Sequence, residues 1–204
     1  MVLSIGKNIF SQNIFKISPG DDSYLIFKGN REIPTDSDSK GSYNITKKPN
    51  TIADDAAVGT ITWENLNNAL LEDGNSATNL HAGGSQSHYL KATNFGFAIP
   101  AGATINGILI SIKREGNTEK DVDVKIVKSD GTIGATDKAD TSIFWPSVLI
   151  WKDYGGSNDL WGETWTTGNI NDSDFGVVIT ETSGPEGGTA KIDNIKTTIY
   201  YTLN

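Results

Sequence analysis

The chain has 204 residues, no cysteine and a formal net charge of −8. This length can bury a sizeable core without disulfide bonds, and the lack of cysteine excludes thiol nucleophiles and thiolate metal sites. No apolar stretch approaches the ~20 residues of a membrane span, and residues 1–18 lack the continuous apolar region of a secretory signal. We therefore expect neither membrane insertion nor export.

Charge divides unevenly along the chain. Residues 1–50 hold seven Lys/Arg and five Asp/Glu, whereas residues 51–204 hold ten Lys/Arg and twenty Asp/Glu. Binding to nucleic-acid phosphates requires a basic surface, so the acidic body argues against nucleic acid as a partner. The polar stretch 34–50 reads as a linker. We therefore predict an N-terminal attachment arm over residues 1–50 and a globular domain over residues 51–204.

The arm contains one candidate strand, "YLIFK" at residues 24–28, followed by the turn-like "KGN". Arms of this kind can add a strand to the edge of a partner's sheet. The predicted partner-binding residues are accordingly Tyr24, Leu25, Ile26 and Phe27.

Beyond Thr51, candidate strands follow one another at short spacing: 60–63, 88–93, 95–99, 104–115, 121–131, 147–152, 175–182 and 190–202. The clearest is 104–115, in which Ile108, Ile110 and Ile112 share one face. Gly107 within it indicates a bulge or a close backbone contact. The only helix-like stretch, 64–71, is too short to shape the fold. The pattern predicts an all-β protein, a jelly-roll-like antiparallel β-sandwich with an extended N-terminal arm.

Reactive chemistry has no clear signature. His81 and His88 lack a spacing diagnostic of metal ligation and are expected in surface loops. Asp121 and Asp123 alternate with valines predicted to face inward, so both carboxylates are expected in solvent. Phosphate-binding and nucleophile motifs are absent, and no carboxylate pair stands out as a glycosidase pair would. We predict no catalytic, cofactor-binding or metal-binding residue and no enzymatic activity.

The five tryptophans leave two interpretations open. Trp161 and Trp165 lie in a stretch otherwise made of Gly, Asn, Asp, Ser and Thr. A sugar-binding platform needs exposed, coplanar aromatic faces. A loop anchor instead needs a buried ring whose N–H reaches a loop carbonyl. Because such loops have few other apolar side chains, we favour the anchor.

Two blocks of the sequence carry a resemblance to a known group. They are "FGFAIPAGATINGI" (95–108) and "YGGSNDLWGETWT" (154–166). From about Trp63 onward, the chain resembles a β-sandwich domain that recurs in structural proteins of tailed bacteriophages and prophages, most of them uncharacterised. The resemblance implies no catalytic residues, and residues 1–50 lie outside it.

The resemblance implies a non-enzymatic virion structural protein: a capsid decoration protein, a head fibre subunit, or a tail or baseplate accessory. It would be assembled in the host cytoplasm, would dock through its arm on the major capsid or tail protein, and would form a homo-oligomer. The alternative is a carbohydrate-binding or host-adhesion module that contacts host surface glycans.

Overall fold

The computed structural model describes residues 41–203, so the predicted partner-binding residues Tyr24, Leu25, Ile26 and Phe27 lie outside the described residues. Within this range the elements, in chain order, are β1 (Gly41–Lys47), β2 (Thr51–Asp55), the short 3₁₀ helix η1 (Leu66–Leu70), β3 (Ala77–His81), β4 (Tyr89–Thr93), β5 (Thr104–Glu115), β6 (Glu119–Val127), β7 (Ile150–Gly156), α1 (Thr167–Asn171), β8 (Gly176–Ser183) and β9 (Gly188–Leu203).

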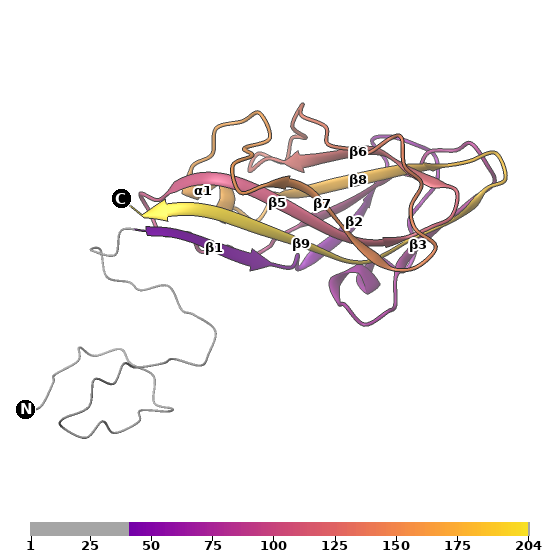
Figure 1. Ribbon diagram of the computed structural model, residues 1–204, viewed down its shortest axis with the longest axis horizontal. Helices are drawn as coiled ribbons and strands as arrows, with labels where there is room; N and C mark the ends of the chain where they lie inside the picture. The colour runs from indigo at the N-terminus through magenta and orange to yellow at the C-terminus, as the bar shows by residue number, and fades with distance from the viewer. Residues whose placement is uncertain (1–40, 204) are drawn as a thin grey trace, which may run out of the picture. The chain divides into compact units, whose positions relative to one another are not determined.

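The strands form two antiparallel sheets that pack on one another (Figure 1). One sheet has the order β1-β9-β5-β7, and β3 also pairs with β9; the other has the order β2-β4-β8-β6. We call them sheet A and sheet B. The prediction of an all-β sandwich is confirmed.

Strand β9 organises sheet A. Its 16 residues pair with β5 along one edge. On the other edge, β1 pairs with its C-terminal half and β3 with its N-terminal half. The two short strands therefore share one edge of β9, and β3 lies toward the end of the sandwich at which β8 leads into β9.

The core between the sheets follows the predicted alternation. Ile108, Ile110 and Ile112 of β5 are fully buried, and Ile195 and Ile199 of β9 lie opposite them on the same face. Burying one such side chain stabilises the fold by about 1.5–3 kcal/mol. These isoleucines are the centre of the sandwich, as the period of the sequence indicates.

The sandwich begins before the predicted boundary at Thr51. Residues 41–47, expected to be part of a linker, instead form β1 and pair with residues 197–203. Their composition is polar because β1 lies at the edge of sheet A and exposes alternate side chains such as Asn44. The hydrogen bonds that hold it come from a segment distant in the sequence, which local patterns do not reveal.

Residues 95–99 illustrate a different departure. Phe95, Phe97 and Ile99 are buried in alternation, as in a strand, yet this segment joins neither sheet. The side chain of Asn171 takes the place of a partner strand, accepting from the Ile99 amide at 2.8 Å and donating to the Ile99 carbonyl at 2.9 Å. The expected strand at 60–63 is likewise reduced to an isolated bridge at Ile61.

The two blocks that resemble phage domains pack on each other. The Trp161 indole is buried and donates to the Ile108 carbonyl at 3.0 Å, and the Ile108 amide donates to the Asp159 carbonyl at 2.9 Å. A side chain at Gly107 would collide with the backbone of Ser157, which confirms the predicted close contact. These blocks therefore hold β5 to the connection that follows β7.

Gly155 should tolerate no side chain at this junction. Its φ is +80°, and an added Cβ would lie 2.6 Å from Trp161 Nε1 and collide with the Ile108 carbonyl. We predict that Gly155→Ala lowers the free energy of unfolding by about 1–3 kcal/mol, measured by urea denaturation. Gly156→Ala, where a Cβ meets no atom within 4 Å, is the matched control and should stay within about 0.5 kcal/mol. Equal effects at both positions would contradict this account.

Candidate functional site

The interior of the sandwich is polar toward the end at which β8 leads into β9. Buried polar side chains gather there from both sheets, and they are Asn79, His81, Arg114, Glu119, Asp121, Glu181 and Ser183. A buried charge is tolerated only when partners satisfy it. A functional site inside the sandwich is therefore expected at this polar end.

Asp121 of β6 is the most heavily bonded of these groups. Its Oδ1 accepts from the Trp145 indole at 2.7 Å and pairs with the Arg114 guanidinium. Its Oδ2 accepts from the Tyr154 hydroxyl at 2.9 Å and from the Asp140 amide at 3.0 Å. The guanidinium carbon lies 4.8 Å from the centre of the Trp145 ring. One carboxylate thus joins β5, β6, β7 and the β6–β7 connection.

The expectation that Asp121 faces solvent is wrong. Strand β6 pairs Asp121 with Glu181 and Asp123 with Thr180, so Val122 is an extra residue in the ladder. Such a bulge changes the alternation of faces. Asp121 therefore points into the sandwich. Asp123, half-buried, lies on the outer face of sheet B. The alternation predicted from the sequence is interrupted at the extra residue, Val122.

The Asp121 network is structural rather than reactive. Burial, reinforced by the charge of Asp121, raises the pKa of Tyr154 above its ordinary value and keeps the hydroxyl protonated. Arg114 and Asp121 are both buried. Removing one partner of a buried ion pair typically costs about 3–5 kcal/mol, because the remaining charge is left unpaired. No substrate reaches these atoms without opening the sandwich.

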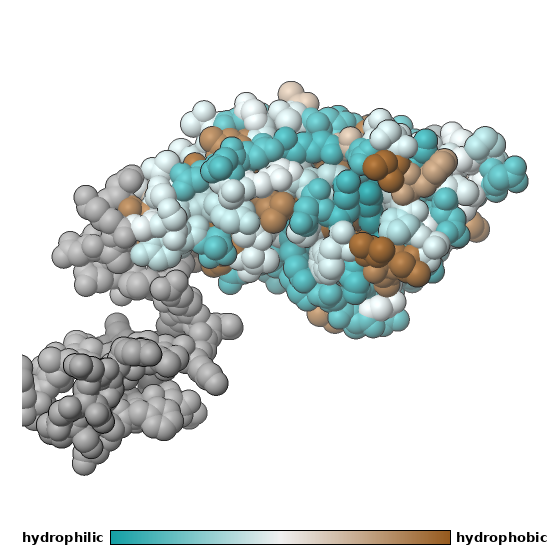
Figure 2. Space-filling model, viewed as in Figure 1, coloured by the Kyte–Doolittle hydropathy of each residue, from teal (hydrophilic) through white to brown (hydrophobic). Residues whose placement is uncertain are grey.

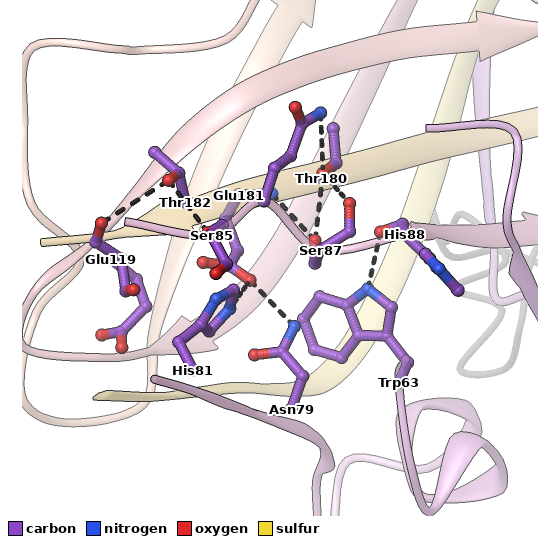
Figure 3. A network of polar contacts seen from close by, with 12 residues as sticks. Trp63, Asn79, His81, Ser85, Ser87, His88, Glu119, Thr180, Glu181 and Thr182 are labelled. Carbon is purple, nitrogen blue, oxygen red and sulfur yellow. Dashed lines mark hydrogen bonds and ion pairs between the residues drawn. The ribbon is translucent and has the colours of Figure 1, made fainter. Parts of the chain in front are cut away.

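A second buried cluster joins β3 of sheet A to β8 of sheet B (Figure 3). His81 Nε2 lies 2.6 Å from Glu181 Oε1, and Asn79 donates to the same oxygen at 2.8 Å. The side chains of His81 and Glu181 are fully buried. The expectation that His81 lies in a surface loop is wrong. It belongs to β3, where alternation with the exposed Leu80 turns it inward.

The pKa of His81 reflects two opposing effects. Burial alone would lower it, but the hydrogen bond to Glu181 and the negative charges of Glu181 and Glu119 outweigh burial and raise it. The raised pKa favours the protonated form of the His81 imidazole, which lies beside the Glu181 side chain. The pair links sheet A to sheet B and is buried from solvent. We call His81 and Glu181 the clasp.

Charged side chains border the surface hollows of the described residues, and they include Asp54, whose Oδ2 lies 2.8 Å from Nδ1 of the half-buried His88. Two open hollows exist, one bordered by Asp140 and Lys152 and the other by Asp55 and Lys91. In each hollow these charges face each other, at 3.1 Å and 3.6 Å. Within residues 41–203, no group of three or more His, Cys, Asp or Glu is placed to hold a metal ion.

The tryptophans act as anchors. Trp161 is buried, and Trp165 donates to the Leu160 carbonyl at 2.9 Å while its ring meets Phe175 edge-on at 5.5 Å. The anchor interpretation is confirmed for Trp161, whereas the Trp165 ring is half-buried. Trp151 is only half-buried, and Lys196 Nζ lies 4.0 Å from the centre of its ring.

Comparisons with known proteins assign the chain to no family. No protein-family model matches the chain, nor does any curated protein or solved structure. Among the residues that the structure describes, no helix is long and apolar enough to cross a bilayer. The resemblance to phage β-sandwich domains therefore rests on the sequence blocks alone.

The clasp should make stability depend on pH. Because the pKa of His81 is raised above its ordinary value of 6.5 in the folded state, its contribution is complete below that value and is lost as pH rises through the folded pKa. We predict that the free energy of unfolding of the wild type falls over this range, by urea denaturation, and that this fall is absent in His81→Gln. Parallel curves for the two proteins would show that folding does not raise the pKa of His81, which would contradict this account.

Proposed function

We propose that the chain is a non-enzymatic structural protein of a tailed-phage virion, either a capsid decoration protein, a head fibre subunit, or a tail or baseplate accessory. In this proposal the N-terminal segment docks on the major capsid or tail protein and the sandwich is exposed. The observation that supports it most is the packing of the two resembling blocks on each other through Ile108 and Trp161. The blocks that carry the resemblance thus hold β5 to the connection after β7.

The chemistry of the sandwich is also consistent with this role. The buried charges at its polar end are engaged with one another, and the two hollows described above are bordered by opposed ion pairs. A protein that acts by binding rather than by catalysis needs a stable fold and an accessible surface, and the sandwich supplies both. Residues 1–40 hold five Lys/Arg and five Asp/Glu, whereas residues 41–204 hold twelve and twenty, and this charge contrast supports a separate attachment segment.

The alternative of a carbohydrate-binding or adhesion module has less support. A sugar platform requires open aromatic faces, yet Trp63, Trp145 and Trp161 are buried. The half-buried ring of Trp151 is covered on one side by Lys196. Within residues 41–203, no pair of tryptophans offers the coplanar exposed surface that this function needs.

The attachment segment is tested in the full chain by Leu25→Ser combined with Phe27→Ser. Each lost apolar contact is worth about 1.5–3 kcal/mol when fully buried in an interface, so we predict at least a tenfold loss of copies that co-sediment with particles from the native host. The folded sandwich should be unaffected. Ile14→Ser combined with Phe15→Ser, in the same N-terminal segment, is the control and should attach normally.

Two results would contradict the proposal, and they differ in meaning. If the Leu25/Phe27 variant attaches as well as the wild type, the assignment of the docking residues is wrong. If the wild-type chain is absent from purified particles, the virion role itself is wrong.

A further inference from the structure

An unusual concentration of exposed apolar side chains lies on the connection between β6 and β7. Ile143, Phe144, Val148 and Ile150 have exposed fractions between 50% and 58%. Scattered single apolar residues are ordinary on protein surfaces, but a contiguous group marks a contact site. On the face in view, Figure 2 shows strongly apolar groups that stand apart from one another among more hydrophilic surface. We call these four residues the β7-edge patch.

The β7-edge patch is held in a fixed place. Trp145, between Phe144 and Pro146, is buried; its indole donates to Asp121 and its amide donates to the Glu119 carbonyl at 2.8 Å. The Pro146 carbonyl accepts from the Gly116 amide at 2.8 Å. A surface ordered in advance loses little conformational freedom on binding. The patch is therefore built for contact.

The patch also has an unpaired strand edge and a positive charge. Strand β7 is the outermost strand of sheet A on this side, and its outer edge pairs with no other strand among the described residues. Open edges readily pair with another chain. Lys120 Nζ lies 4.3 Å from the centre of the Phe144 ring, which places a cation within the patch.

The opposite side of sheet A has a second apolar group with the opposite charge. Leu71 and Leu80, with exposed fractions of 60% and 75%, lie after η1 and in β3. The exposed carboxylates of Glu64 and Asp73 accompany them, whereas the Glu72 carboxylate pairs with Lys113 and Lys196 of this same copy. The Glu64 amide donates to the Thr78 carbonyl at 2.7 Å, which brings this acidic residue beside β3. We call Leu71, Leu80, Glu64 and Asp73 the β3-edge patch.

We propose that the β7-edge patch of one copy docks on the β3-edge patch of a second copy. The contact joins apolar surface to apolar surface and Lys120 to the carboxylates. Pairing identical edges would instead bring cations against cations or carboxylates against carboxylates, which is unfavourable. Because β3 and β7 lie on opposite sides of sheet A, the contact is heterologous, and its repetition gives a ring or a filament.

This inference goes beyond the proposed virion role and does not depend on it, because it concerns the purified chain in the absence of particles. Attachment to particles and self-association are separate measurements, so the failure of one leaves the other standing.

The test uses the full chain and sedimentation equilibrium over a range of concentrations. We expect the wild type to exceed the monomer mass of 21.9 kDa as concentration rises. Val148→Asp and Leu80→Asp should each remain monomeric, because each destroys one of the two patches. Asn44→Asp, at an exposed position of β1, is the control and should associate like the wild type.

Mixing the two variants decides whether the contact is heterologous. The Val148→Asp chain keeps an intact β3-edge patch and the Leu80→Asp chain keeps an intact β7-edge patch, so an equimolar mixture should form a one-to-one dimer that goes no further. Circular dichroism checks that both variants are folded, and Ile143→Asp replaces Val148→Asp if that variant is not.

Three outcomes would overturn the proposal. The first is a wild type that stays monomeric at every concentration. The second is a Leu80→Asp variant that associates as strongly as the wild type while Val148→Asp does not, which would show that identical β7 edges meet. The third is a mixture of the two folded variants that stays monomeric.

Discussion

The carboxylate of Asp121 is the constraint on which the outer parts of the sandwich depend. Buried inside the fold, it must be satisfied there, and its donors come from sheet A and from the β6–β7 connection. Meeting that requirement draws Trp145 inward. In an extended segment, the neighbours of an inward residue face outward. The exposure of Phe144 therefore follows from the partner that Asp121 needs.

The interior and the surface of the molecule have separate tasks. Isoleucines of β5 and β9 fill the centre of the sandwich, while the polar end is closed by the Asp121 network and by the clasp between His81 and Glu181. Both networks join elements that are distant in the sequence, and removing one partner of a buried pair is costly because the other is left unpaired. The interior is thus committed to stability, and the surface is left to make contacts. A structural role in an assembly uses a body of this type.

The sequence predicted those parts that obey a regular local period. Alternation identified the buried face of Ile108, Ile110 and Ile112, and Gly107 marked a close contact that is present. Prediction failed where residues distant in the sequence determine the local structure. Strand β1 exists because β9 accepts it, and Asp121 turns inward because a bulge at Val122 interrupts the alternation. The polar end was missed for the same reason, since its members come from four separate strands.

The most direct test of this account is native-state hydrogen exchange on the wild type and Asp121→Asn, well below the unfolding temperature of each. The amides of Gly116 and Trp145 report the β6–β7 connection, and the Ile108 amide reports the contact with Asp159. We predict that the variant loses protection at Gly116 and Trp145 but keeps it at Ile108. Unchanged protection at Trp145 would contradict the claim that Asp121 holds this part of the sandwich in place.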